Sequence, residues 1–222
     1  VVLAALQRQH HALEAAPSAA APQRRQITSL FADLVDFTAL SESLDPEMAT
    51  EMLNALWAEL DTVIVAHGGF IDKHMGDGVM ALWGVAQTRE DDAERAVRAA
   101  LALQAALREF NVKMRRNLPP LHLRVGLNTG LALLGQIGTT GEFSAIGDTI
   151  NLASRLEDAA PVDGVLVSQD TYHQVWGLFD LQPQSPLTVK GRREPVQTYL
   201  VQRVQPRSFW SRTRGIEGVE TP

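Results

Sequence analysis

The alternation of hydrophobic and polar positions predicts a domain in which strands and helices follow one another. The apolar run at 27–34 has the period of two that is typical of a strand. Residues 90–115 instead carry apolar side chains three and four positions apart, which predicts a helix with one buried stripe. Another helix is predicted to begin at Asp45-Pro46, a capping residue followed by proline, and to end at Gly68-Gly69.

The same patterns predict the remaining elements. Further strands are predicted at 70–75, 79–83, 122–128, 131–137, 143–146, 164–168, 178–182 and 196–203, and further helices at 148–159 and 169–175. A tight turn, Gly76-Asp77-Gly78, joins the first two of these strands, and a glycine-rich loop occupies 138–141. The order of the first elements predicts an α+β fold with a ferredoxin-like βαββαβ core and additional C-terminal strands and helices.

Composition divides the chain into one domain and two flanking segments. Residues 1–25 are predicted to form a helix over 1–15 and an Ala/Pro linker, residues 26–204 the main domain, and residues 205–222 a tail or a linker to a downstream region. The 222 residues, 45% of them hydrophobic, suffice for one sizeable core. We expect the chain to be a segment of a longer protein, because it begins with Val and ends in a tail without element signals.

Charge and cysteine content exclude several classes of function. A net charge of −6 and a pI near 5.5 argue against a nucleic-acid binder, which would usually present a basic surface. The absence of cysteine excludes disulfides, zinc–thiolate sites and a thiol nucleophile, and is consistent with a cytoplasmic location. Since no apolar stretch reaches about 18 residues, direct membrane insertion is not expected.

Two aspartates at the ends of apolar runs are candidate metal ligands. Asp33 lies near the end of the run at 27–34, and Asp77 lies in the turn between two predicted strands. A hard divalent cation prefers carboxylate oxygens, and two such ions can drive phosphoryl chemistry. A strand-end aspartate is also a common turn former, and Asp36 competes with Asp33 as the first ligand. The residues alone therefore leave the site open.

Several motifs along the main domain resemble the catalytic domain of class III nucleotide cyclases. The family pattern Phe-x-Asp-x-x-x-Phe begins at Phe31, and so selects Asp33 over Asp36. The run at 147–155 matches the family pattern Gly-x-x-Val-Asn-x-Ala-x-Arg, with Ile150 in place of the valine. This second run is the most specific motif in the chain.

The resemblance implies a metal-assisted reaction at phosphorus. In that family two divalent ions, Mg or Mn, are bound by the aspartates that correspond to Asp33 and Asp77; one activates the ribose 3′-hydroxyl and the other binds the triphosphate. Asn151 is implied to orient the ribose, and Arg155 to stabilise charge on the transferring phosphorus. Four residues apart, these two share one helix face, which the residues alone also allow to be a solvated face with Arg155 paired to Asp158.

Two further residues are implied in the choice of base. Lys73 lies four residues before Asp77, where the family places a lysine that specifies adenine. A lysine only donates hydrogen bonds, so it suits the acceptor N1 of adenine and not the donor N1 of guanine. Ser144, three residues before Gly147, is the implied partner that accepts from the adenine amino group, with a plain loop serine as the alternative. His74, adjacent to Lys73, is predicted to face the other side and to be structural.

Two features are candidate contacts of the triphosphate. Backbone N–H groups of 34–38, including those of Phe37 and Thr38 at the start of a short helix, are candidate phosphate ligands, with a plain strand-to-helix turn as the alternative. Lys190 matches a family lysine in a Val-Lys-Gly run that contacts the triphosphate, although a solvated turn lysine is an alternative.

Together these matches imply an adenylate cyclase that makes 3′,5′-cyclic AMP and pyrophosphate from ATP. The family works as a head-to-tail homodimer with composite active sites. One protomer would supply Asp33 and Asp77, and the other Lys73, Ser144, Asn151 and Arg155. A serine at position 144 resembles a bacterial and soluble-type subgroup, some of whose members respond to bicarbonate, and so predicts bicarbonate activation. Two alternatives remain: a guanylate cyclase, against which Lys73 argues, and a catalytically silent domain that dimerises or senses nucleotide.

Overall fold

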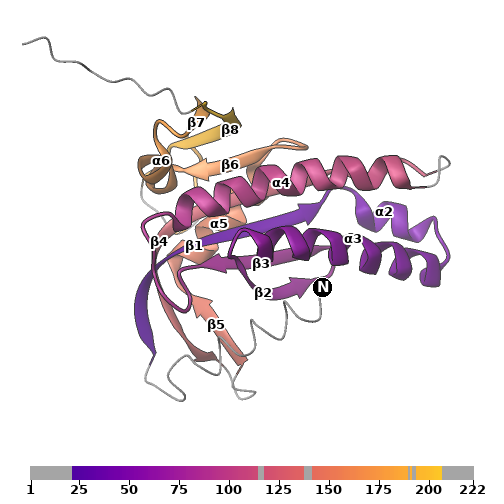
Figure 1. The fold of residues 1–222 in the computed structure, drawn as a ribbon, viewed down its shortest axis with the longest axis horizontal. Coiled ribbons are helices and arrows are strands. Elements are labelled where there is room, and N and C mark those ends of the chain that lie inside the picture. The colour runs from indigo at the N-terminus through magenta and orange to yellow at the C-terminus, as the bar shows by residue number, and fades with distance from the viewer. Residues whose placement is uncertain (1–21, 115–117, 138–141, 190, 192–193, 207–222) are drawn as a thin grey trace, which may run out of the picture.

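The computed structural model describes residues 22–114, 118–137, 142–189, 191 and 194–206 (Figure 1). The strands are β1 (Gln23–Leu34), β2 (Phe70–Met75), β3 (Gly78–Trp83), β4 (Leu123–Ile137), β5 (Glu142–Ile146), β6 (Val165–Ser168), β7 (Phe179–Pro183) and β8 (Thr198–Val204). The helices are α2 (Phe37–Glu42), α3 (Pro46–Ala66), α4 (Asp92–Lys113), α5 (Asp148–Ala159) and α6 (Gln169–Val175). The predicted helix at 1–15, the predicted loop at 138–141 and the tail beyond 206 lie outside the described residues.

The strands form one mixed eight-stranded sheet in the order β2-β3-β1-β4-β6-β8-β7, with β5 paired to β4 off this path. β1 runs antiparallel to both β3 and β4, whereas β4 and β6 are parallel. The first four strands, β2-β3-β1-β4, are arranged as the predicted ferredoxin-like core, and β6, β8 and β7 extend the sheet beyond β4. Among the described helices, none has both the length and the hydrophobicity required to cross a bilayer.

The structure corrects two predicted boundaries. β1 begins at Gln23, so the last residues of the predicted linker belong to the strand and pair with β4. The side chain of Arg25 holds this early part of β1 in place, because its Nη1 donates to the carbonyls of Val85 and Ala86 at 2.8 and 2.7 Å. The strands predicted at 122–128 and 131–137 are one strand, β4. The residues at 128–130, between the two predicted strands, pair with β1 in the same unbroken register as the rest, and so they do not end the strand.

Helices cover both faces of the sheet. α3 and α4 pack against one face, where they enclose Leu30 and Leu34 of β1. α5 packs against the other face, where Ile150 and Ala153 contact a cluster that includes Phe31. Figure 1 shows α3 and α4 in front of the sheet and α5 behind it. The alternation predicted for β1 is confirmed, since neighbouring residues of this strand lie in different clusters.

The backbone of α5 lies against β4 at Gly126. A Cβ atom at this position would be 2.1 Å from the backbone nitrogen of Glu157, so no larger residue fits without moving the helix. The N-terminal turn of α5 is also bonded to β4. The Thr149 hydroxyl donates to the Leu131 carbonyl at 2.7 Å, and the Asn128 amide donates to the Thr149 carbonyl at 3.0 Å. These contacts hold the helix and its exposed face in one position.

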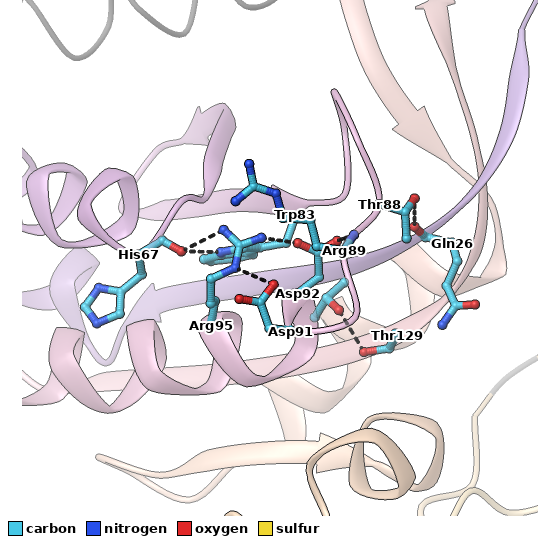
Figure 2. Close-up of polar contacts among 10 residues, drawn as sticks. Gln26, His67, Trp83, Thr88, Arg89, Asp91, Asp92, Arg95 and Thr129 are labelled. Carbon is cyan, nitrogen blue, oxygen red and sulfur yellow. Dashed lines mark hydrogen bonds and ion pairs between the residues drawn. The ribbon is translucent and has the colours of Figure 1, made fainter.

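A polar network joins the ends of α3, β3 and α4 (Figure 2). The guanidinium of Arg95 binds the Asp92 carboxylate and donates to the His67 carbonyl at 3.4 Å. The Trp83 indole N–H donates to the same carbonyl at 3.0 Å. Burial raises the pKa of the Asp92 carboxyl, although the Arg89 amide and Arg95 oppose this effect. The network therefore fastens the far end of the β2–β3 hairpin, which carries Asp77 in its turn, to the helical layer.

We predict that Gly126→Ala lowers the free energy of unfolding by about 3 kcal/mol, because the added methyl group meets the backbone of α5 and not a flexible side chain. Urea denaturation, monitored by circular dichroism, measures the change in the free energy of unfolding. Gly135→Ala, on the same strand, is the matched control: its Cβ would lie 3.4 Å from Pro22, an ordinary contact. The control should stay within about 0.5 kcal/mol of the parent. Equal stabilities of the two variants would contradict the proposed close contact.

Candidate active site

Asp33 and Asp77 lie next to each other where β1 pairs with β3. Asp33 is opposite Gly78 in the antiparallel register, and the Leu34 N–H donates to the Asp77 carbonyl at 3.3 Å. A Cβ atom on Gly78 would lie 2.6 Å from Asp33 Oδ1, so the glycine leaves the space that this carboxylate occupies. The structure therefore brings together the two aspartates that the sequence placed at strand ends.

Negative charge accumulates around this pair. Burial raises the pKa of the Asp33 carboxyl to about 6; the charges of Asp77 and Asp158 add to this rise, and Arg124 opposes it. Burial, with the charge of Asp33 next in importance, also raises the pKa of Glu157 to about 7. Carboxylates that repel one another in this way are stabilised by a bound cation.

The donor set fits a magnesium-like ion. Within the described part of the chain, no group of three or more His, Cys, Asp or Glu side chains is arranged to hold a metal. Mg²⁺, however, is usually bound by one or two carboxylates, with substrate phosphates and water completing its shell. Asp33 and Asp77 provide two such carboxylates, and the space beside Gly78 admits them.

Sequence reasoning missed two charged residues of this site. Glu157 follows Ala153 and Ile150 at spacings of four and seven on α5, so helical periodicity alone places a carboxylate on the side that faces the sheet. That signal was present in the sequence. Arg124, in contrast, meets Asp33 only through the pairing of β1 with β4. No local pattern reveals that register.

Asn151 and Arg155 are exposed on the outer face of α5. Arg155 Nη1 lies 3.2 Å from Asp158 Oδ2, and both side chains are 59% exposed. The single chain therefore contains the alternative that the sequence allowed, a solvent-exposed ion pair of Arg155 and Asp158. Exposed pairs of this kind contribute between 0 and about 1 kcal/mol, so the guanidinium exchanges partners at little cost. The charge of Asp158 contributes to the raised pKa of Asp33, so the C-terminal end of α5 lies near this aspartate.

Lys73 and Ser144 meet at one carboxylate oxygen. The Ser144 hydroxyl donates to Asp72 Oδ2 at 2.7 Å, and Lys73 Nζ lies 3.4 Å from the same oxygen. The two residues implied in base choice are thus brought together by Asp72, which sequence reasoning missed. The prediction for His74 is confirmed, since its ring faces α3 and its Nε2 lies 3.2 Å from Asp61 Oδ2.

The predicted phosphate-binding segment is shorter than expected. The Leu34 N–H donates to Asp77 and the Val35 N–H to His122, so strand pairing uses both amides. The amides of 36–38 open α2, where a helix has no internal partners for its first N–H groups. The Phe37 side chain is buried in the core, so a role of this residue in binding would involve its backbone, whereas Thr38 is exposed. Lys190 lies outside the described residues.

Comparison with known proteins identifies the family of the chain. Residues 19–203 match the family model for the "Adenylate and Guanylate cyclase catalytic domain". Adenylate cyclase 1 of Rhizobium meliloti (strain 1021) is 37% identical over 185 residues, which cover 80% of this chain and 28% of that protein. The chain thus spans less than a third of the length of this relative.

Solved structures of both adenylyl and guanylyl cyclases have the same fold. The adenylyl cyclase CyaB from P. aeruginosa and the guanylyl cyclase Cya2 are each 34% identical to this chain, with a TM-score of 0.81. Each similarity covers 85% of this chain, and it covers 98% of the CyaB chain and 97% of the Cya2 chain. Sequence, sheet topology and the paired aspartates lead to one conclusion: the chain belongs to the adenylate and guanylate cyclase catalytic domain family.

Proposed function

We propose that this domain is an adenylate cyclase that converts ATP to 3′,5′-cyclic AMP and pyrophosphate. The ribose 3′-oxygen attacks the α-phosphorus in line with the bond to the leaving pyrophosphate. The observation that carries this proposal is the adjacent, electrostatically coupled pair Asp33 and Asp77, in a chain of the cyclase family. Asp33 lies at the end of the β1–β3 ladder, and Asp77 lies in the adjoining turn between β2 and β3.

Asp33 and Asp77 would hold two divalent ions, Mg or Mn. When bound, such ions lower the pKa of a coordinated alcohol and neutralise triphosphate charge. The protein's own contribution is the concentration of negative charge. Glu157 and Asp158 stand near the pair and Arg124 balances part of their charge, which favours a cation at this position.

Asn151 and Arg155 act on the substrate and not on the metal. The Asn151 amide orients the ribose, and the Arg155 guanidinium stabilises the charge that develops on the phosphorus. Preorganised donors of this kind typically contribute about 3 kcal/mol each. Both side chains point outward from α5, and Arg155 has only a weak exposed partner, which leaves it available to a substrate.

The outward position of these residues supports a homodimer with composite sites. Three large apolar side chains are exposed on the strands that carry the site: Met75 is 44% exposed, Leu131 66% and Ile146 47%. Exposed apolar groups that lie near a site favour contact with another protein surface. In this arrangement a second copy of the chain brings its Asn151 and Arg155 to the aspartates of the first.

Lys73 and Ser144 support ATP as the substrate. Lys73 donates to adenine N1, and the Ser144 hydroxyl, whose hydrogen is directed at Asp72, accepts from the adenine amino group. A guanylate cyclase is the second candidate, because the similarity to the guanylyl cyclase Cya2 is as close as that to the adenylyl cyclase CyaB. Bicarbonate activation, which rests on Ser144 and the overall style of the motifs, stays a prediction of the family resemblance.

The purified protein should convert ATP to equal amounts of cyclic AMP and pyrophosphate in the presence of Mg²⁺ or Mn²⁺, and should convert GTP more slowly because Lys73 cannot accept from guanine N1. Chromatography of the products measures both rates. Faster turnover of GTP would show the alternative substrate. No product from either nucleotide, in a sample shown to be dimeric, would identify a silent domain.

Complementation tests the composite site. Asp33→Ala and Arg155→Ala should each reduce activity at least about a hundredfold, because each removes a group that acts at the phosphorus. Their mixture should recover activity, since one site of the heterodimer keeps all its residues. A mixture of Asp33→Ala and Asp77→Ala is the matched control and should stay inactive, because both changes fall in the same half of the site. Proven heterodimers of the first pair without recovery would refute the arrangement.

The affinity for Mn²⁺ should depend on pH through Asp33. The raised pKa of about 6 means that the carboxyl is protonated below this pH, and an ion must then displace the proton. We expect the apparent association constant to fall about tenfold per pH unit below that pKa and to level off above it. Titration calorimetry from about pH 5 to about pH 8 measures the curve. A constant affinity across this range would contradict the role of Asp33 as a ligand.

A further inference from the structure

Asp72 is a buried carboxylate that the proposed reaction does not yet use. Its side chain is 0% exposed, whereas that of the adjacent Lys73 is 49% exposed. The pairing of β2 with β3 shifts register here: Ile71 pairs with Ala81 and Lys73 with Met80, which leaves Asp72 as an extra residue in β2. Neighbouring residues of a regular strand face opposite sides, but a bulge changes this alternation. The side chains of Asp72 and Lys73 therefore lie together, with Lys73 Nζ 3.4 Å from Asp72 Oδ2.

The contacts of Asp72 determine the hydrogen-bonding direction of Ser144. A carboxylate accepts hydrogen bonds and does not donate them, and a serine hydroxyl has one hydrogen. Because the Ser144 hydroxyl donates to Asp72 Oδ2 at 2.7 Å, its lone pairs are directed elsewhere and can only accept. Lys73 Nζ, 3.4 Å from the same oxygen, keeps further N–H groups for another partner.

The result is a donor beside an acceptor, which matches adenine. The adenine edge presents N1 as an acceptor and the amino group as a donor, whereas guanine presents N1–H as a donor and O6 as an acceptor. A serine that is free to rotate would serve both bases. A serine whose hydrogen is bonded to Asp72 can only accept from the base, so it suits adenine and not guanine.

We propose that Asp72 is a positioning residue for base selection: it orients the Ser144 hydroxyl as an acceptor for the exocyclic amino group and holds Lys73 beside it as a donor. The proposal rests on the proposed adenylate cyclase function. It assigns selectivity to three residues, of which Asp72 does not touch the base.

The test compares ATP with purine riboside triphosphate, which keeps N1 but lacks the exocyclic amino group. In the whole dimeric protein, the ratio of kcat/KM for ATP to kcat/KM for the analogue should fall about tenfold in Ser144→Ala, the value of one hydrogen bond of about 1.4 kcal/mol. Asp72→Asn should lower the same ratio by a similar factor, because an amide can donate to the serine as well as accept from it. The double variant should fall no further than either single variant.

Asp61→Asn is the matched control. Asp61 is a largely buried carboxylate that pairs with His74 on the opposite side of β2, so its loss should leave the ratio unchanged. A purely structural role of Asp72 would lower the rates for both nucleotides without changing their ratio, and that result would overturn the proposal. A ratio that changes in neither Ser144→Ala nor Asp72→Asn would overturn it too.

Two further measurements distinguish a change in base selectivity from misfolding of a variant and from a lack of cyclase activity in the parent protein. Circular dichroism and gel filtration check each variant, and Asp72→Ser replaces Asp72→Asn if the latter does not fold. If the parent protein forms no cyclic AMP, the proposed function fails by that result alone. The selectivity is then measured as the ratio of dissociation constants for the two nucleotides by calorimetry, with the same tenfold loss expected and an unchanged ratio again contradicting the proposal.

Discussion

The contact of α5 with β4 at Gly126 is the constraint on which the active site depends. The absence of a side chain there lets the helix backbone approach the strand, so that the position of the helix is set by backbone contact. From this position α5 directs Glu157 toward the aspartates of the sheet and presents Asn151 and Arg155 to the outside. One helix thus contributes charge around Asp33 on one side and carries the exposed side chains of Asn151 and Arg155 on the other.

The carboxylates around Asp33 repel one another, which is unfavourable for stability and typical of functional sites. Several carboxylates share a partly buried region in which Arg124 provides only partial compensation. Groups with strongly raised pKa values are typical of functional sites. Burial, and after it the repulsion between carboxylates, raises the pKa values of Asp33 and Glu157, and a bound cation would relieve the repulsion. The core elsewhere consists mainly of apolar clusters, and it includes hydrogen-bonded polar pairs such as the buried hydroxyls of Thr28 and Thr129 at 2.9 Å.

The bulge in β2 has a similar role at the other end of the site. A single extra residue places Asp72 beside Lys73, and this carboxylate then meets Ser144 from a strand more than seventy positions away. The hydrogen bond from Ser144 to Asp72 follows from that meeting, and in our proposal its direction is what distinguishes adenine from guanine. A regular strand with the same sequence would direct Asp72 and Lys73 to opposite sides of the sheet.

The sequence by itself determined the elements whose signals are local. The proline at the start of α3, the turn that holds Asp77 and the apolar stripe of α4 each depend on residues a few positions apart, and their predicted bounds agree with the structure to within about two residues. Family motifs added the candidate residues. The continuity of β4, the pairing of Arg124 with Asp33 and the contact of Asp72 with Ser144 were decided only by the tertiary structure. The physical reason is that strand register and bulges bring together residues that are far apart in the chain, and no local pattern records such pairings.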